Sequence, residues 1–306
     1  MSLLALVAIS LSAQQRKSGT PEHTAPAARK AAPEKLAAQV LIDRAGFSPG
    51  EIDGAGGTNT DNAIDAYQRV TGMQVADLVA AAQEPPTTKY TISTEDMATP
   101  LTPSMPADMM AKSRLKRLNY TSVLEMLGEK FHTSPALLKR LNPRLKVAAG
   151  EQIVVPNVNV VSDAEGKPRP DVVIHVSKSA STLWVTDGSG KTIMHAPVTS
   201  GSEHDPLPIG EWAVTAVSRN PTFNYNPDLF WDANPAHSKA KIPPGPNNPV
   251  GVVWIDLSKE HYGIHGTPEP STIGHTESHG CVRLTNWDAL RLAAMVGKGT
   301  KVEFVE

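Results

Sequence analysis

The sequence predicts a multidomain protein, with a mainly β C-terminal domain preceded by a small helical module and a small α+β module. The chain has 306 residues, enough for two or three domains of ~100–200 residues each. Short β-rich runs recur through residues 171–306, whereas apolar residues of the first half recur at helical spacing. Segments rich in proline and threonine separate these regions and are typical of linkers.

The overall composition is that of a soluble globular protein, with 40% hydrophobic and 20% charged residues. A formal net charge of −2 offers no electrostatic attraction for nucleic acid or for an anionic membrane. We therefore expect no nucleic-acid partner, and we expect a monomer.

The N-terminus carries a short apolar run, Leu3 to Leu11, which a Leu-Ser-Ala sequence ends at Ala13. This run is shorter than the ~20 residues that a membrane span needs, and it is typical of a secretory signal. Residues 1–13 therefore predict export to the periplasm or cell envelope, without stable membrane insertion after cleavage. Because no positive charge precedes the run, a plain apolar tail is the alternative. Residues 14–33 are rich in Ala, Pro, Lys and Arg and predict a disordered tether.

Residues 34–80 predict a small helical module. Apolar residues at helical spacing mark two helices, Leu36, Val40 and Leu41 in the first and Ala63, Ala66, Tyr67 and Val70 in the second. Gly72 is placed to end the second helix. A generic helical bundle would have this pattern, but "AAQVLIDRAGF", "IDGAGGTNT" and "AIDAYQ" together resemble the peptidoglycan-binding-domain family. The resemblance implies binding to cell-wall glycan or peptide.

Residues 118–158 predict the α+β module, between linkers at 81–117 and 159–170. The first linker has one candidate strand, at Lys89–Ser93. Within the module, Ser134 and Pro135 are suited to the N-cap and first turn of a helix. Two helices followed by "LNP" and "GEQIVVP" resemble the LysM family, with "NYTSV" where that family usually has Gly-Asp-Thr. The resemblance implies affinity for polymers that contain N-acetylglucosamine.

Residues 171–306 predict a β sandwich or barrel with a small helical cap. The candidate strands are "VVIHV", "TLWVT", "IMHAPV", "EWAVTAV", "VGVVWI" and "KVEFV", and "TDGSG" between two of them is a hairpin-turn signal. One helix is expected near the end, with Thr285 and Asp288 forming its capped start and Gly297 its end.

The single cysteine of the chain, Cys281, lies in a cluster of histidines. His261, His265, His275 and His279 all precede it within a stretch of 21 residues. One cysteine cannot form an internal disulfide, and a lone cysteine is most often a small buried hydrophobe. The neighbouring histidines leave three interpretations open: a metal site, a structural loop and a thiol nucleophile.

Two of these interpretations explain the cluster poorly. Two His-x3-His pairs and a thiol would suffice for tetrahedral zinc, but His-x3-His ligation favours a helix, and the glycines and prolines of this stretch exclude one. The "HTESH" sequence also has Glu at the wrong offset for a zinc protease. In a structural loop the histidines would satisfy local hydrogen bonds, which suits His261 and His275 better than the whole cluster.

The third interpretation is a cysteine nucleophile with a histidine base. A free thiol is mostly protonated at neutral pH, and a histidine within hydrogen-bond reach can remove its proton. The histidine needs an orienting partner on its other nitrogen, for which a backbone carbonyl suffices. Backbone N–H groups at Gly280 and Cys281 could line an oxyanion hole.

"YGIHGT", then "SHGCVRL", resembles the catalytic domain of the L,D-transpeptidase (YkuD-domain) family, and "PVTSG", "PLPIGEW" and "PPGPNNPVGVVWIDL" agree with it. The resemblance implies a mainly β, sandwich-like fold and the stem peptide of peptidoglycan as substrate. The residue roles it implies are Cys281 as nucleophile, His265 as general base, the Gly266 carbonyl as orienter of His265, His279 as a supporting residue, Gly280 in the oxyanion hole, and Arg283, Thr267 and Ser278 in substrate binding or in bracing the site.

The implied chemistry is a two-step acyl transfer without cofactor or metal. Cys281 attacks the carbonyl of the third stem residue and expels D-Ala, and an amine of a neighbouring stem resolves the acyl-thioester into a crosslink. Water as acceptor would make the protein an L,D-carboxypeptidase, and a non-catalytic wall-anchoring protein is the remaining alternative. The resemblance also suggests a carbapenem as a reactive mimic of the substrate.

Overall fold

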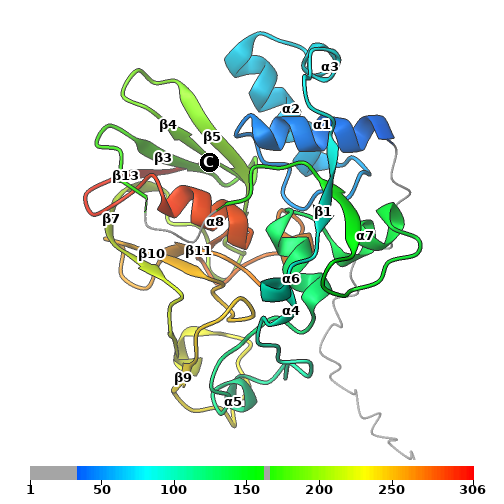
Figure 1. Ribbon diagram of the computed structural model, residues 1–306. Helices are drawn as coiled ribbons and strands as arrows, with labels where there is room; N and C mark the ends of the chain where they lie inside the picture. Colours follow the sequence, from blue (N-terminus) through cyan, green and yellow to red (C-terminus); the bar gives the residue numbers. More distant parts are fainter. Residues whose placement is uncertain (1–32, 162–165) are drawn as a thin grey trace, which may run out of the picture.

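A computed structural model describes residues 33–161 and 166–306 (Figure 1). The predicted signal segment 1–13 and the predicted tether 14–33, except Pro33, lie outside the described residues. Across the two described ranges, no helix combines the length and the apolar character that a membrane crossing requires.

The C-terminal region is built on one nine-stranded sheet with the order β5-β4-β3-β13-β7-β10-β11-β12-β6. Its strands are β3 (Val173–Ser177), β4 (Thr182–Thr186), β5 (Thr192–Pro197), β6 (Thr199–Ser200), β7 (Gly210–Arg219), β10 (Val253–Leu257), β11 (Gly263–His265), β12 (Val282–Arg283) and β13 (Lys301–Val305). Most neighbours are antiparallel, but β13 pairs with β3, and β11 with β12, in parallel. The mainly β prediction for this region is confirmed.

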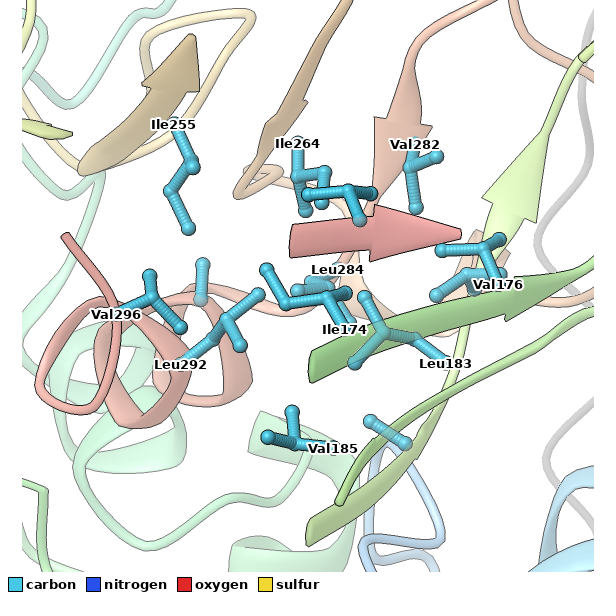
Figure 2. Packing of buried hydrophobic residues seen from close by; sticks show 14 of the residues in the cluster. Ile174, Val176, Leu183, Val185, Ile255, Ile264, Val282, Leu284, Leu292 and Val296 are labelled. Carbon is cyan, nitrogen blue, oxygen red and sulfur yellow. The ribbon is translucent and has the colours of Figure 1, made fainter. Parts of the chain in front are cut away.

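The long strand β7 joins two halves of this sheet. Its first residues pair with β13, and its later residues, from Val214 to Arg219, pair with β10. Buried side chains of both halves meet in one core, as Figure 2 shows for Ile174 and Leu183 on one side and Ile264 and Val282 on the other. The alternation of buried and more exposed residues along β3, β4, β10 and β13 supplies much of this shared apolar face.

Helix α8 (Asn286–Ala293) covers one end of this core. The Thr285 side chain accepts a hydrogen bond from the Asp288 amide, as the sequence predicts, and Leu292 is fully buried. The helix ends at Ala293, before the predicted stop at Gly297. Gly297 instead accommodates the segment that enters the β domain, because a Cβ on it would lie 2.9 Å from the Pro168 ring.

The first unit of the chain is helical. It contains α1 (Pro33–Arg44), α2 (Thr58–Thr71) and α3 (Val75–Ala80). Gly72 ends α2 in the left-handed conformation, with φ of 70°. This unit contacts the β domain through its backbone, since the Ser48 amide donates to the His195 carbonyl at 2.8 Å and the His195 amide donates to Gly46 at 3.0 Å.

The second unit contains a two-stranded sheet and two helices: β1 (Thr87–Thr91), α6 (Val123–Lys130), α7 (Pro135–Leu141) and β2 (Gln152–Pro156). Strand β1 pairs antiparallel with β2. The structure therefore differs from the expected open linker at 81–117, which contains β1, α4 (Thr94–Met97) and α5 (Met109–Lys112). The partner of β1 lies some 65 positions later, so the local sequence can indicate a short strand but cannot indicate its pairing.

The remaining elements lie beside the β domain. Strands β8 (Phe223–Tyr225) and β9 (Ala240–Ile242) form a hairpin whose connecting loop includes η1 (Pro227–Leu229), and η2 spans Pro270–Thr272. Helix α5 lies next to this hairpin (Figure 1). The described end of the second expected linker is also packed, because the Arg169 amide donates to the Met295 carbonyl at 2.8 Å.

Candidate active site

Two short parallel strands carry the predicted catalytic residues. In the register of β11 and β12, Ile264 lies opposite Val282 and His265 lies opposite Arg283. Ile264 and Val282 are fully buried in the core. Because side chains alternate along a strand, His265 and Arg283 point to the face away from that core, and Cys281, one residue before Val282, follows the same alternation.

Cys281 is partly buried at the end of this face. Its Sγ lies 3.8 Å from the carbonyl oxygen of His261, which sits in a turn with a positive φ of 67°. Burial raises the pKa of the Cys281 thiol, while a hydrogen bond from the Gly263 backbone and the charge of Arg283 oppose that rise. The resting sulfur is therefore a thiol at neutral pH, and it needs a base to become a nucleophile.

His265 is buried, and its hydrogen bonding selects one tautomer. Its Nδ1–H donates to the carbonyl of Gly266 at 2.7 Å, which leaves Nε2 as the basic nitrogen. The Trp254 indole stacks on the imidazole, with ring centroids 5.4 Å apart. Burial, assisted by Arg283, lowers the pKa of His265 to about 3, so the imidazole is neutral.

The two predicted partners are not hydrogen-bonded to each other. Among the described residues, the sulfur of Cys281 contacts the His261 carbonyl, and no hydrogen bond joins it to His265. With the thiol pKa raised and the imidazole pKa lowered, the pair is neutral rather than a thiolate–imidazolium pair. Proton transfer would then accompany substrate binding, when catalytic hydrogen bonds commonly shorten.

Two motif glycines are required by close contacts. A Cβ on Gly266 would lie 2.2 Å from Oδ1 of Asn286, which accepts a hydrogen bond from the Val252 amide. Gly280 has a φ of 91°, and a Cβ there would lie 2.7 Å from the Tyr262 ring. These positions therefore exclude side chains for steric reasons that the motif alone does not reveal.

Ser278 fixes the loop that carries the cysteine. Its hydroxyl donates to the Cys281 carbonyl at 2.6 Å and accepts from the Gly201 amide at 2.7 Å. Thr267 is buried, and its hydroxyl accepts from the Glu269 amide at 3.2 Å. Both side chains are therefore engaged with the backbone around the site.

His279 is held by a residue that the sequence analysis missed. Its Nε2 lies 2.8 Å from Oδ1 of Asp232, in the loop between β8 and β9. The rings of Phe230 and Trp231 lie 4.9 and 5.8 Å from the imidazole. No local pattern marks Phe230, Trp231 or Asp232, because their contact depends on how the hairpin folds over some 47 positions.

The site also presents hydrogen-bond donors with no partner. Arg283 forms neither a hydrogen bond nor an ion pair with any described residue, although Glu269 and Asp232 are near enough to affect its pKa. The backbone N–H groups of Gly280 and Cys281 likewise donate to no residue within the described ranges. These donors are available to a carboxylate and to a developing oxyanion.

The other histidines of the cluster diverge from the site. His261 and His275 are exposed, and the His261 ring lies 3.4 Å from its neighbour Glu260. The described part of the chain contains no group of three or more His, Cys, Asp and Glu side chains that could hold a metal ion.

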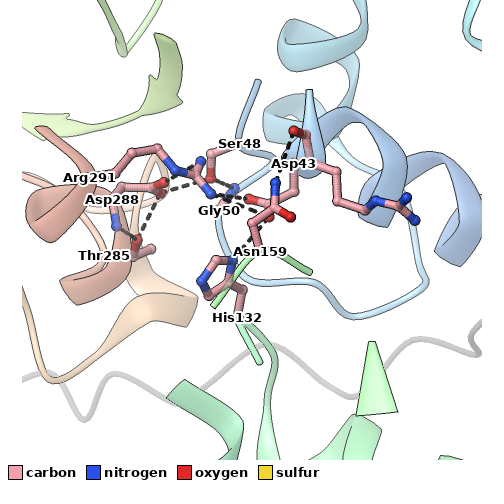
Figure 3. A network of polar contacts seen from close by, with 9 residues as sticks. Asp43, Ser48, Gly50, His132, Asn159, Thr285, Asp288 and Arg291 are labelled. Carbon is pink, nitrogen blue, oxygen red and sulfur yellow. Dashed lines mark hydrogen bonds and ion pairs between the residues drawn. The ribbon is translucent and has the colours of Figure 1, made fainter. Parts of the chain in front are cut away.

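A second polar cluster, which the sequence analysis also missed, joins the three units (Figure 3). Asp43 of α1 is fully buried, and its carboxylate lies 3.0 Å from His132 Nδ1 and 3.3 Å from Arg291 Nη2. Arg291 also contacts Asp288 at 3.4 Å, and Ser48 donates to Asp288 at 2.8 Å. We call Asp43, Ser48, His132, Asp288 and Arg291 the junction.

The comparisons with known proteins agree with the geometry of the site. The family model for the L,D-transpeptidase catalytic domain (YkuD) matches residues 171–304. A Bacillus licheniformis protein with the provisional name L,D-transpeptidase YkuD is 32% identical over 185 residues, which cover 58% of this chain and 91% of the relative. Its Bacillus subtilis counterpart is 31% identical over 183 residues, covering 58% of this chain and 91% of the relative.

A solved L,D-transpeptidase from Mycobacterium smegmatis covers 52% of this chain and 65% of its own, with 16% identity and a TM-score of 0.37, too low to support an inference. The sequence relatives suffice, since this chain spans nearly the whole length of proteins to which it is more than 30% identical. The chain therefore belongs to the L,D-transpeptidase family, and residues 171–304 are its catalytic domain.

Proposed function

We propose that this protein is a cysteine-dependent L,D-transpeptidase that acts on peptidoglycan stem peptides through an acyl-thioester on Cys281. The observation that carries the proposal is the placement of Cys281, His265 and Arg283 on one face of the parallel strands β11 and β12. A thiol, a neutral imidazole with a free Nε2 and an unpaired guanidinium are the groups that acyl transfer from a carboxylate-bearing donor peptide needs.

In the first step the sulfur of Cys281 attacks the carbonyl carbon of the third stem residue. Nε2 of His265 takes the thiol proton, and the N–H groups of Gly280 and Cys281 bind the oxyanion. The tetrahedral intermediate collapses to a thioester, and the proton goes to the nitrogen of the leaving D-Ala. The unpaired Arg283 is suited to bind a carboxylate of the donor peptide.

In the second step an amine attacks the thioester carbon, and the sulfur leaves as the thiol. When the amine belongs to a neighbouring stem, the product is a 3→3-type crosslink, whereas water would give L,D-carboxypeptidase activity. No metal or redox cofactor takes part in either step. A wall-anchoring role without catalysis is disfavoured by the complete set of unpaired donors around Cys281.

The N-terminal units are proposed to bind cell-wall polymer in the exported protein. The alignment with the Bacillus licheniformis relative covers 58% of the chain, and the catalytic match ends two residues before the C-terminus. About 40 aligned residues must therefore precede residue 171, since the catalytic match itself spans 171–304. For residues 118–158, sugar binding rests on the LysM-like sequence motifs and on the order of α6, α7 and β2. For the helical unit 33–80, a peptidoglycan-binding role rests on its sequence motifs alone.

Incubation of the full-length protein with purified sacculi, followed by muropeptide analysis, tests the proposal. New 3→3 crosslinks that require Cys281 would support transpeptidation. Shortened stems without crosslinks would indicate a carboxypeptidase, and unchanged muropeptides with retained sacculus binding would indicate an anchoring protein.

A further inference from the structure

The loop of the β8–β9 hairpin contacts the loop that carries the nucleophile. Asp232 accepts a hydrogen bond from His279 at 2.8 Å, and Phe230 packs edge-on against the same imidazole. His279 precedes Cys281 by two residues. The position of the hairpin loop, residues 226–239, therefore bears directly on the surroundings of the thiol.

A segment of the N-terminal half packs against this hairpin. We call residues 98–118 the insert, because they separate strand β1 and helix α4 from helix α6 of the second unit. Leu118 of the insert and Ile242 of β9 are both fully buried in one small cluster with Tyr225. The side chains packed around that cluster are Met105, Met109 and Leu115 from the insert and Phe223, Phe230 and Ala240 from the hairpin.

A polar chain joins the same two segments. Nε2 of His237 lies 2.7 Å from Oδ2 of Asp108, and Nδ1 of His237 lies 2.9 Å from the hydroxyl of Tyr225. Asp108 is itself fixed, because its carboxylate accepts from the Ala111 amide and so caps helix α5. The insert thus holds the hairpin through an apolar cluster and a directional hydrogen-bonded chain.

The backbone of the insert is also hydrogen-bonded to the segment that follows strand β9 of the hairpin. The Leu118 amide donates to the Pro244 carbonyl at 2.9 Å, and the Leu118 carbonyl accepts from Asn247 at 3.0 Å. A Cβ on Gly245 would lie 2.1 Å from that Leu118 carbonyl, so the two segments approach more closely than side chains allow. Burial lowers the pKa of Lys112 in α5, and the charge of Glu269, beside the site, opposes this lowering.

From these contacts we propose that the insert is a brace, which holds the hairpin loop 226–239 against the Cys281 loop. Asp108 and His237 are then positioning residues for the reaction at Cys281. The proposal rests on the proposed function, because it assigns the N-terminal half a part in acylation besides binding to the wall. The catalytic domain is then not freely tethered to the N-terminal half, because the insert directly supports its active site.

The first test uses Asp108→Asn in the full-length protein. Asparagine still caps a helix, so α5 is retained while the charged partner of His237 is lost. We expect hydrogen exchange of amides in 226–239 to become at least about threefold faster. Acylation of Cys281 by a carbapenem should slow by about fivefold, because the loop no longer completes the site. Exchange in β3 to β5 and the thermal midpoint should stay unchanged.

The matched control is Asp228→Asn, the same substitution in the same hairpin loop. Asp228 is exposed and pairs with Lys239 at 3.5 Å, without contact to the insert. It should alter neither hydrogen exchange nor acylation. Tyr225→Phe, which keeps the ring but removes the link to His237, should reproduce the effect of Asp108→Asn in both measurements.

The second test asks whether the brace acts through Asp232. If it does, Asp108→Asn should slow acylation by less than about twofold in a protein that already carries Asp232→Asn, since coupled residues are not additive. Full additivity, unchanged exchange after Asp108→Asn, or an equal effect of Asp228→Asn would each overturn the proposal. Hydrogen exchange needs no substrate, so it tests the brace independently of catalysis. An absence of transpeptidation on sacculi would overturn the proposed function but not the brace.

Discussion

The active site and the junction are two buried polar clusters with opposite origins. The predicted catalytic residues of the active site lie in a short stretch, His265 to Arg283, in which the motif fixes the spacing. The junction joins Asp43 to His132, 89 positions away, and to Arg291, 248 positions away. One cluster is local in sequence, and the other exists only because three units pack together.

The two clusters also differ in how their charged side chains are paired. In the junction each carboxylate has at least two partners, since Asp43 contacts His132 and Arg291, and Asp288 contacts Ser48 and Arg291. In the active site Arg283 has no described partner. Paired charges are typical of a structural cluster, even though Nε2 of His132 in the junction is buried without a hydrogen-bond partner. An unpaired guanidinium close to a thiol is typical of a site that awaits a ligand. The difference separates a structural cluster from a functional one.

The largest effect that follows from this difference is the loss of turnover in Cys281→Ser. An alcohol is far harder to ionise than a thiol, and a neutral His265 with a lowered pKa is a weak base for it. Crosslinking of sacculi should fall by ~10³-fold or more. The thermal midpoint should stay within a few degrees of wild type. Turnover at the wild-type rate would refute the assignment of the nucleophile.

The next largest effect separates the two histidines of the active site. His265→Ala should slow acylation by ~10²–10⁴-fold, because it removes the only proposed proton acceptor. His279→Ala should cost about tenfold or less, since His279 acts through its contact with Asp232. Acylation by a carbapenem, measured in both variants, checks this order. A larger loss in His279→Ala would mean that the general base has been misassigned.

The sequence predicted the mainly β domain well because its signals are local. Strand alternation, the "TDGSG" turn and the Thr285 cap each depend on a few adjacent residues, and each is present in the structure. The hydrogen bond from His265 to the Gly266 carbonyl joins neighbouring residues, so a motif can encode it. The roles of these residues in catalysis stay predictions until they are measured.

The sequence failed where a contact depends on distant pairing. Asp232 reaches His279 only through the hairpin, and the candidate strand at Lys89–Ser93, which overlaps β1, gave no sign of its pairing with β2. The junction was missed for the same reason, because its residues come from segments far apart in the sequence. Proline- and threonine-rich composition indicates loops but does not say whether those loops pack.

A third prediction concerns stability and tests the junction directly. Asp43→Ala leaves Arg291 and His132 buried with one partner fewer, and breaking such a pair typically costs ~3–5 kcal/mol. Chemical denaturation should report this loss in the free energy of unfolding. The matched control is Glu84→Gln, which breaks the exposed Arg44–Glu84 pair and should cost less than ~1 kcal/mol.

This variant also tests whether the two clusters are independent. The junction and the active site share no residue, so Asp43→Ala should leave the acylation rate per folded molecule unchanged at low temperature. An acylation loss as large as that of His265→Ala would show that the junction positions the catalytic loop. The clusters would then have to be treated as one unit.

The smallest expected effect is a difference in how acid acts on the two clusters. Arg291 and His132 hold the pKa of Asp43 at about 2, below its ordinary 3.8, against the opposing effect of burial. A lowered carboxyl pKa contributes stability that is present above about pH 4 and lost as the pH falls towards 2, worth ~2 kcal/mol. Burial raises the pKa of Asp288, and this opposite shift offsets part of the stability that Asp43 contributes.

The active site should respond in a higher pH window. His265 stays neutral in the folded protein down to about pH 3, whereas an unfolded histidine binds a proton near pH 6.5. The unfolded state therefore gains protons first, and His265 lowers stability as the pH falls from about 6.5 to 3. Asp43→Asn should flatten the loss of stability only below about pH 4, and His265→Gln should flatten it from about pH 6.5 downward. Denaturation midpoints measured from pH 7 to 3 separate the two windows. If both variants flattened the same window, the two clusters would titrate as one, and the division between a structural and a functional cluster would fail.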